Sequence, residues 1–516
     1  MQVACGTGDS IDVHFRDTII GGAYLNNQKL VRVMVNEAPQ RVKDLEEYGT
    51  EIIRENGKYK LFPFPGCTYP RAVLTSGPYQ GGFIEGLVEE VKRLGIEIFE
   101  DTMITELLIQ NGTAVGAIGI HLPTGNFLIF KSRSTMLTSG GAGQLYPLTT
   151  NPADVTGDGY AMAYRSGAKL MDMEFIQSRA CIVYPSALGG QPPPGDGLVT
   201  IGGRFYNALG ERYMKKYDPI NMERVTRDLM MIYAHKEIKA GKGTARGGVY
   251  NDLSGVPEEE LKHFSKFLIA CKAENIDPRW QPIEWAPGVH HFMGGLRINE
   301  KCETNVSGLY AAGEAAAGIH GANRLAGNAL TETQVFGARA GKFAAERALS
   351  ISSPKINQEQ INEEWNKISK IVERKEGENA LNVKREIQAI MGNYVGVTRN
   401  EAELKIALRK LEEIRKTRLL KLCIVGEKAY QGLREALEVI NLVDLAEVVA
   451  KAALIRTESR GAHYREDYLQ RDDKNWLKNI IIRLQGGKME SQLVPAVMTE
   501  MKPRLEKGGN NGFTSR

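Results

Sequence analysis

Alternating helical and strand patterns predict an α/β fold that is interrupted by an inserted α+β domain and followed by a helical bundle. Glycine-rich turns stand where predicted strands end, both early in the chain and again after residue 288. From residue 355, apolar residues recur every three or four positions among Glu and Lys. We therefore predict a first domain in two parts, 1–172 and 288–352, an inserted domain at 173–287, a helical domain at 355–457 and a C-terminal segment at 458–516.

The first domain shows its helices and strands in order. Apolar residues at helical spacing predict helices over residues 27–48 and 83–94. A β-rich stretch begins at 96–99 and reaches residue 137. The predicted strand then gives way to the tight turn Ser139-Gly-Gly-Ala-Gly143, and Thr156-Gly-Asp-Gly159 opens a helix that runs to about residue 166.

The later regions differ in composition and in predicted secondary structure. Pro- and Gly-rich loops in the inserted domain are accompanied by a polar helical region over residues 221–238. Strands and glycine turns return over residues 290–349. The segment from residue 458 is predicted to be irregular, with a frayed Gly-Gly-Asn-Asn-Gly tail. Its charge-dense part, residues 459–473, taken by itself is typical of a solvated or ion-paired surface.

Composition excludes several classes of function. The 516 residues carry 66 Lys and Arg against 62 Asp and Glu, and this net charge of +4 is too small and dispersed to indicate nucleic acid binding. The six cysteines are scattered singly, without a Cys-x-x-Cys pair for zinc or an iron–sulfur cluster, so we predict no metal site. No apolar run approaches the ~20 residues needed to cross a bilayer, so we expect a soluble cytoplasmic protein or one attached peripherally to the inner face of a membrane.

Residues 309–341 are the most informative stretch for function. A short apolar strand runs into Gly313-Glu314, a glycine-rich turn presents His320 and Arg324, and a helix of small residues begins near Asn328. Backbone amides and one cation therefore converge beside a helix N-terminus, which is a place to hold an anion against a cofactor.

The other motifs are informative in combination rather than singly. The turn at 139–143 alone is slightly more typical of structure than of cofactor binding, but together with 156–159 and Gly313-Glu314 it favours a dinucleotide site. His290 and His291 point to opposite faces of a predicted strand, so they make a poor metal pair. A lone histidine is usually structural, and only its proximity to the glycine motifs favours a functional His290.

Taken together, these segments resemble the flavoprotein family of succinate dehydrogenase, fumarate reductase and L-aspartate oxidase, from Met1 to about Lys478. The matching motifs are Ser139–Gly143, Thr156–Gly159, Gly210-Glu-Arg212, Thr226-Arg-Asp228, His290–Gly295, Gly313-Glu314, His320–Arg324 and Ser459–Asp473. The resemblance implies a Rossmann-like FAD-binding domain interrupted by a capping domain, with the substrate between the two, and a helical domain after them.

The resemblance also implies roles for single residues. Arg227 matches the catalytic arginine, a proton shuttle opposite the flavin. The implied substrate-carboxylate ligands are His290, Arg324 and Thr200, and the implied FAD contacts are Gly140, Gly141, Asp158, Glu314, Asn328, Ala329 and Leu330. The helix after Asn328 would aim its positive end at the flavin pyrimidine.

Two departures bear on the substrate. Ser178-Arg179 stands where the family has a histidine ligand, and Ile201-Gly-Gly-Arg204 replaces the relay that follows the threonine. Arg179 could supply a bidentate carboxylate contact, or it could mark a different substrate. Fumarate and succinate are favoured over another unsaturated or α-substituted acid.

A third departure is at the start. Met1-Gln-Val-Ala aligns just after the family's first strand, its Gly-x-Gly-x-x-Gly turn and the helix that receives the pyrophosphate. We therefore expect a truncated form, or a chain begun at an internal methionine.

The leading expectation is the flavoprotein subunit of a fumarate reductase or succinate dehydrogenase type enzyme, which transfers hydride between FAD and a dicarboxylate. Its electrons would pass through a separate iron–sulfur protein. The alternatives are an L-aspartate oxidase or related FAD-dependent acid reductase, and a truncated, catalytically silent interaction subunit.

Overall fold

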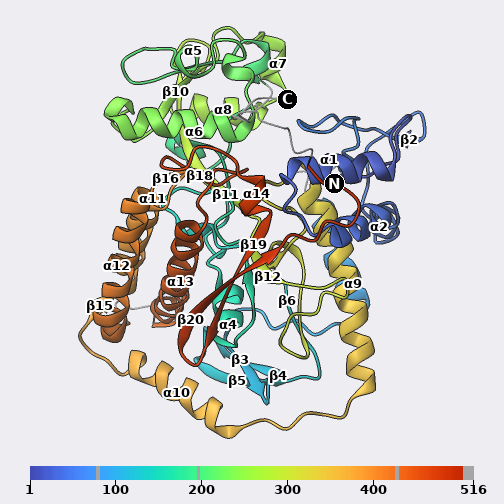
Figure 1. Ribbon diagram of the computed structural model, residues 1–516, viewed down its shortest axis with the longest axis vertical. Coiled ribbons are helices and arrows are strands. Elements are labelled where there is room, and N and C mark those ends of the chain that lie inside the picture. Colours follow the sequence, from blue (N-terminus) through green and yellow to red (C-terminus); the bar gives the residue numbers. More distant parts are fainter. Residues whose placement is uncertain (77–81, 195–197, 425–428, 504–516) are drawn as a thin grey trace.

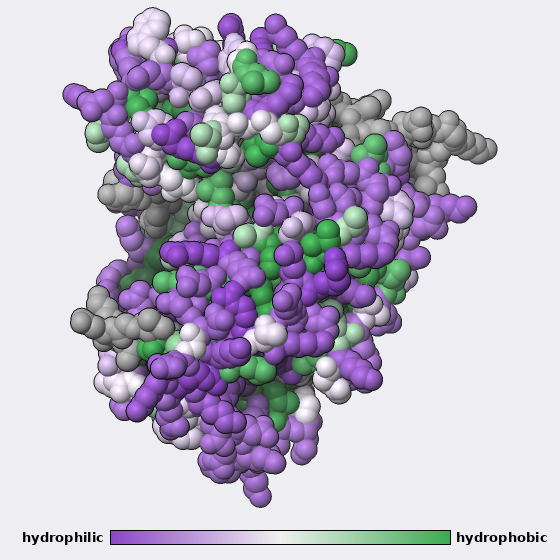
Figure 2. All heavy atoms as spheres, turned by 90° about the vertical axis from the view of Figure 1, so that its left-hand side faces the viewer, coloured by the Kyte–Doolittle hydropathy of each residue, from purple (hydrophilic) through white to green (hydrophobic). Residues whose placement is uncertain are grey.

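The computed structural model describes residues 1–76, 82–194, 198–424 and 429–503. Figure 1 shows the inserted domain with helices α5 to α8 at the top, helices α11 to α13 of the helical domain on the left, and the long helix α9 on the right. The C-terminal strands β19 and β20 cross the middle of the molecule between these parts. On the face that Figure 2 shows, hydrophilic side chains predominate and hydrophobic ones are scattered.

The first domain places its glycine motifs at one sheet edge. Strands β6 and β13 pair in parallel, with Leu309 opposite Thr135 and Ala311 opposite Leu137. Because parallel strands end at the same edge, the turn at 139–143 and Gly313-Glu314 lie side by side. The elements of the first part are α1 (Ile11–Gly21), α2 (Gln28–Glu47), β1 (Arg54–Glu55), β2 (Lys58–Tyr59), α3 (Gly82–Arg93), β3 (Thr102–Gln110), β4 (Thr113–His121), β5 (Asn126–Lys131), β6 (Thr135–Leu137), α4 (Asp158–Arg165) and β7 (Leu170–Met171).

The predicted helices at 27–48, 83–94 and 156–166 are confirmed by α2, α3 and α4. The prediction that strand begins at 96–99 was wrong, because β3 starts at Thr102, where β4 lies opposite. Three of residues 96–99 are apolar, but they pair with no strand among the described residues, and Ile98 and Phe99 remain exposed. Apolar character alone therefore did not make them a strand.

The inserted domain is an antiparallel sheet covered by helices. The strand order is β8-β11-β10-β9. Its elements are β8 (Ile176–Tyr184), β9 (Arg204–Tyr206), α5 (Met214–Tyr217), α6 (Arg227–Glu237), β10 (Val249–Asp252), α7 (Glu258–Lys262), α8 (Ser265–Ala273) and β11 (Ile283–Phe292). Strand β11 runs through the predicted boundary after residue 287. Helix α6 is shorter than the polar helical region predicted at 221–238, and it is not polar, because Leu229, Met230 and Met231 are buried.

The second part of the first domain and the helical domain follow. Their elements are β12 (Gly295–Arg297), β13 (Leu309–Ala311), β14 (Ala316–Ala317), α9 (Asn328–Ser350), α10 (Gln358–Val372), β15 (Glu378–Asn379), α11 (Ala380–Tyr394), β16 (Thr398–Arg399), α12 (Glu401–Thr417), β17 (Leu422–Cys423) and α13 (Ala429–Ile455). The predicted helical bundle is confirmed, with α13 packed against α11 and α12. No helix in the described part of the chain combines the length and the apolar character that a membrane crossing requires.

The prediction of an irregular segment after residue 458 was wrong. It contains β18 (Tyr464–Arg465), α14 (Asp473–Trp476), β19 (Lys478–Gln485) and β20 (Lys488–Pro495). Strands β19 and β20 form an antiparallel hairpin that extends the five-stranded sheet β14-β12-β7-β19-β20. Most of β20 is exposed, so its sequence lacks the apolar alternation that would have revealed it. The predicted frayed tail lies outside the described residues.

The charge-dense motif at 459–473 is not simply a surface segment, because Arg460 and Arg465 are fully buried beside a network of ion pairs. Arg456, directly after α13, is fully buried, and its Nε lies 2.6 Å from Oε1 of Glu174. Its Nη1 lies 3.0 Å from Oε1 of Glu458, which also pairs with Arg460 at 2.7 Å. The guanidinium stacks 4.7 Å from the ring centre of Phe175. This network ties the end of the helical domain to the start of the inserted domain.

Replacing Arg456 with Met should destabilise the protein strongly. Removal of Arg456 would leave Glu174 buried without its ion-pair partner, which costs about 3–5 kcal/mol, whereas Glu458 would keep its pair with Arg460. The unfolding temperature, followed by circular dichroism, should fall by several degrees. Lys405→Met is the matched control, since it breaks an exposed pair with Glu401 and should cost at most about 1 kcal/mol. Equal unfolding temperatures for the two variants would contradict a central role for Arg456.

Candidate active site

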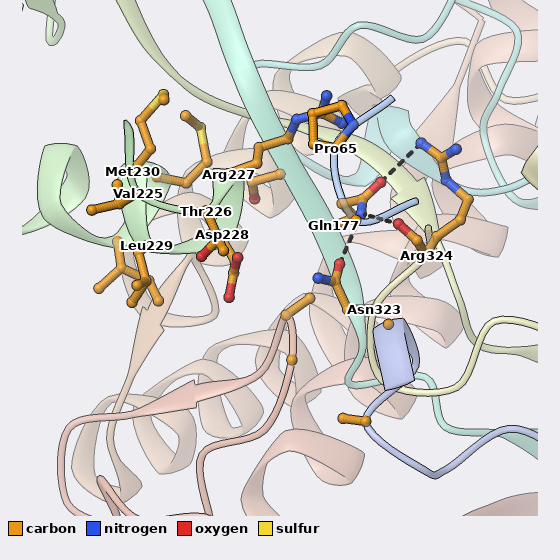
Figure 3. A pocket seen from close by; sticks show the side chains of 18 of the residues that line it. Pro65, Gln177, Val225, Thr226, Arg227, Asp228, Leu229, Met230, Asn323 and Arg324 are labelled. Carbon is orange, nitrogen blue, oxygen red and sulfur yellow. Dashed lines mark hydrogen bonds between the residues drawn. The ribbon is translucent and has the colours of Figure 1, made fainter. Parts of the chain in front are cut away.

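A cavity of about 710 Å³ lies between the inserted domain and the first domain. It is lined by residues of α1, β8, α6, the turn at 323–326 and the segment 459–462. Figure 3 shows Arg227 extending from the start of α6 toward Pro65 and Gln177, while Arg324 reaches Gln177 from the other side. Two residues predicted from widely separated motifs therefore meet at one cavity.

Arg324 is a buried cation in this cavity. It is only 8% exposed, and its Nη2 donates a 2.9 Å hydrogen bond to Oε1 of Gln177. Among the described residues its Nε has no hydrogen-bond partner. Burial lowers the pKa of Arg324 to about 10, and the neighbouring charges of Arg227 and Arg179 lower it as well. The charge of Glu314 acts in the opposite direction. The side chain therefore stays protonated at neutral pH, and because no described residue forms a direct ion pair with it, the binding of an anion is favoured.

His290 is displaced from the strand ladder by a β-bulge. The register of β11 against β8 runs from Val289 opposite Ser178 directly to His291 opposite Gln177, so His290 is the extra residue. Its Nδ1 lies 2.7 Å from Oγ1 of Thr150. The two histidines do diverge, because Nδ1 of His291 lies 3.3 Å from Oε2 of Glu314.

The charges of three arginines act on His290, although neither His290 nor Arg179 is among the residues that line the cavity. Burial lowers the pKa of His290 to about 2, and the charges of Arg324, Arg179 and Arg227 lower it further in the same direction. These arginines come from the 323–326 turn, from β8 and from the first residue of α6. The cluster therefore combines a neutral imidazole with three cations, an arrangement suited to a ligand with two negative charges. Thr200 lies in a 3₁₀ turn, Leu198–Ile201, but its side chain is outside the described part of the structure.

Glu314 is an ionised acceptor at the end of β13. Its Oε1 accepts a 2.8 Å hydrogen bond from the backbone N–H of Phe292. Burial alone would raise the pKa of Glu314, but the charge and hydrogen bond of His291 outweigh burial and lower it. A carboxylate held in this form can accept hydrogen bonds from sugar or ribityl hydroxyls.

The glycine turn leaves bare backbone beside Glu314. Gly140 has φ +77°, a conformation that L side chains rarely adopt. A Cβ on Gly141 would lie 2.2 Å from Oε1 of Glu314, so only glycine allows this approach. Asp158 is differently engaged, since its oxygens accept hydrogen bonds from Oγ1 of Thr156 at 2.6 Å and from Nδ2 of Asn441 at 2.5 Å. A direct FAD contact by Asp158 stays a prediction.

Helix α9 presents an uncapped N-terminus. Gly327 precedes it in the left-handed conformation and makes no side-chain cap. The side chain of Asn328 is buried, with Oδ1 2.9 Å from Nε2 of His14, so it anchors the helix to α1. Ala329 is half-buried and Leu330 is 45% exposed. The first amides of a 23-residue helix are thus left to bind an electronegative group.

These features fit FAD. The uncapped amides at 329–330 suit the carbonyl side of an electron-rich ring, the bare turn at 140–141 suits close backbone approach, and Glu314 suits hydroxyl groups. Within the described residues no group of three His, Cys, Asp or Glu side chains could hold a metal ion.

Comparison with known families agrees with this geometry. A family described as an FAD binding domain matches residues 1–330, and one described as the C-terminal region of the fumarate reductase flavoprotein matches residues 384–507. The chain belongs to the fumarate reductase and succinate dehydrogenase flavoprotein family. It is an FAD-dependent oxidoreductase of this type, and the fold class is the one that the resemblance implied.

Individual relatives cover most of the chain. A protein of Methanothermobacter marburgensis, named as one of the subunits of fumarate reductase (CoM/CoB), is 40% identical over 94% of this chain and 88% of its own. The L-aspartate oxidase 2-b of Nicotiana tabacum is 34% identical over 92% of this chain and 76% of its own. The solved structure of Mycobacterium smegmatis Sdh1 in complex with UQ1 superposes with a TM-score of 0.89 at 33% identity, covering 97% of this chain and 88% of that one.

The sequence analysis did not single out Gln177 or the pairing of His291 with Glu314. Gln177 and Arg179 stand two positions apart on β8, so they share a face of the sheet. Once Arg179 was proposed as a ligand, that spacing could have indicated Gln177 as a further residue of the site. The contact of His291 depends on how β11 packs against the 313–315 turn, and no local pattern indicates it.

Acid should destabilise the protein through His290. Its pKa is about 2 in the folded state against 6.5 for an unperturbed histidine, so protons favour the unfolded chain increasingly as pH falls below 6.5. Between pH 7 and pH 5 this costs about 2 kcal/mol. His290→Asn should therefore show a smaller fall in unfolding temperature over this range than the wild type. His263→Asn, at an exposed position, is the control, and parallel curves for all three proteins would contradict a buried neutral His290.

Proposed function

We propose that this protein reduces fumarate to succinate, or catalyses the reverse reaction, as the flavoprotein subunit of a larger enzyme. The observation that carries the proposal is that Arg227 and Arg324 line one cavity beside the residues that fit FAD, while the charges of both arginines and of Arg179 act on His290. A dicarboxylate carries two charges that such a cluster can compensate.

The residues divide the work in a chemically consistent way. Bound FAD would accept or deliver a hydride at one of the two central carbons of the acid. Arg324 and His290 would hold carboxylates, and Arg179 would add a planar, bidentate contact in place of the family's histidine. Arg227 would stabilise the developing charge and exchange the proton at the neighbouring carbon. Fumarate plus one hydride and one proton gives succinate.

L-Aspartate oxidase is the second candidate, because relatives with that name are 34% identical to this chain. The charges of the cavity favour a substrate without an amine. Its acidic lining residues are Asp17, Glu223 and Asp228. Asp17 pairs with Arg71 at 2.9 Å and Glu223 with Arg212 at 2.6 Å, while burial raises the pKa of Asp228 and so disfavours its negative charge. A substrate ammonium would therefore face mainly arginines, which repel it.

We also propose that the electron partner is a separate iron–sulfur protein. The sequence lacks closely spaced cysteines for a cluster, and several relatives are named as fumarate reductase flavoprotein subunits. A cytoplasmic location, with or without attachment to the membrane face, stays a prediction.

Purified protein supplied with FAD should be yellow, and fumarate should reoxidise it after reduction by dithionite. Succinate should reduce an artificial dye in the reverse assay, whereas L-aspartate should leave the flavin oxidised. Reduction by aspartate without any reaction with fumarate would favour the oxidase. Protein that stays colourless with added FAD would favour a catalytically silent subunit.

Arg227→Lys should abolish fumarate turnover and leave the FAD content unchanged. Lysine keeps the charge but not the length and planar donor set that position Arg227 in the cavity, so a loss of at least about a hundredfold in kcat is expected. Arg279→Lys, which alters an exposed pair with Asp277, is the control and should turn over normally. Near-normal turnover by Arg227→Lys would contradict its role as the proton shuttle.

A further inference from the structure

Gln177 makes an unusual set of hydrogen bonds to Arg324. Its Oε1 accepts from Nη2 of Arg324 at 2.9 Å, while its Nε2 donates to the backbone oxygen of the same residue at 3.0 Å. Nε2 also donates to Oδ1 of Asn323 at 2.8 Å. Figure 3 shows these three bonds between β8 and the 323–326 turn. One amide therefore holds both ends of one arginine.

Holding both ends restricts the arginine to few rotamers. Arg324 has four rotatable side-chain bonds, and a free arginine would lose about 2 kcal/mol of rotamer entropy on binding a ligand. With its backbone oxygen and its guanidinium both bound to Gln177, most of that loss is incurred before a ligand arrives. The side chain is preorganised.

The chemical type of the holding group matters as much as its position. Gln177 is neutral, and the guanidinium of Arg324 forms no direct ion pair with the described residues, although the charge of Glu314 acts on it without such a pair. A carboxylate at the same place would also accept from Nη2, but it would cancel the charge on which anion binding depends. It would also lack the N–H donors that Asn323 and the Arg324 backbone require.

We propose that Gln177 is a positioning residue that fixes Arg324 while leaving its positive charge uncompensated for a carboxylate of the substrate. The inference rests on the proposed function in assuming that the anion is a dicarboxylate acid. Gln177 acts through Arg324 and need not touch the substrate.

The test compares Gln177→Glu with Gln177→Leu. Glu has the shape of Gln and should be the milder change if Gln177 serves only packing. If Gln177 preserves the charge of Arg324, the Glu variant should be the worse of the two. The control is Gln360→Glu, because Gln360 likewise bridges two elements, accepting from the N–H of Ile109 at 3.0 Å and donating to the oxygen of Leu107 at 2.7 Å.

Two quantities should be measured on protein loaded with FAD. The first is KM and kcat for fumarate with a reduced dye. The second is the Kd of malonate, a dianion without a CH–CH bond to oxidise, from the change it causes in the flavin spectrum. Gln177→Glu should raise both KM and Kd at least about tenfold and change kcat less than about threefold. Gln177→Leu should raise them less, and Gln360→Glu should not change them.

The outcomes separate the two proposals. A Leu variant as impaired as the Glu variant, or wild-type values in both, would overturn the role of Gln177. Wild-type protein that binds malonate but does not reduce fumarate would overturn the proposed function, and the malonate Kd values would still decide the role of Gln177. Wild-type protein that binds no dicarboxylate would overturn both. If the Glu variant loses FAD, Gln177→His replaces it in the test, because histidine offers a neutral acceptor. Its KM for fumarate should stay within about threefold of the wild-type value, whereas the KM of Gln177→Leu should not. Equal KM values for the His and Leu variants would count against the proposal.

Discussion

The active site depends on the buried pairing of Arg456 with Glu174 and Glu458. Glu174 stands two residues before β8, the strand that carries Gln177 and Arg179. Glu458 also pairs with Arg460. Two residues further on, the backbone N–H of Ala462 donates a 3.0 Å hydrogen bond to the backbone oxygen of Ala322, which stands two residues before Arg324. The same network therefore sets the position of both segments that meet at the substrate cavity. Such a network is costly to break, since each removed partner leaves a charge without water.

Electrostatics explains why the cavity would bind acids. Burial lowers the pKa of Arg324 and of His290, and the charges of the neighbouring arginines lower both further, while the charge of Glu314 opposes the shift at Arg324. An anion that enters would relieve this unfavourable charge. A site of this kind binds its ligand strongly because the free state is strained electrostatically, and a neutral partner such as Gln177 preserves that strain while fixing the geometry.

Apart from the carboxylate of Glu314, the cofactor side of the site relies on backbone rather than on side chains. Gly140, Gly141 and Gly327 adopt positions or conformations that a side chain would hinder. The side chain of Asn328 faces the interior, so the contacts available to a ligand are the amides that follow it. Charged side chains are therefore concentrated where the substrate would bind, whereas the cofactor would be held mainly by the shape of the backbone and by the positive N-terminus of α9.

The sequence by itself determined the alternating α/β pattern, the helical domain and the glycine motifs, because these depend on local periodicity and on short motifs. Through the resemblance to a known family it also indicated Arg227, Arg324 and His290 as candidates. Only the tertiary structure decided which of them meet. The bulge that displaces His290, the hydrogen bonds of Gln177 to Arg324, the burial of Arg460 and Arg465, and the pairing of β19 with β7 all depend on contacts between residues that are separated in the chain. Such contacts leave no periodic signal, since the partner that stabilises each element lies in another part of the sequence.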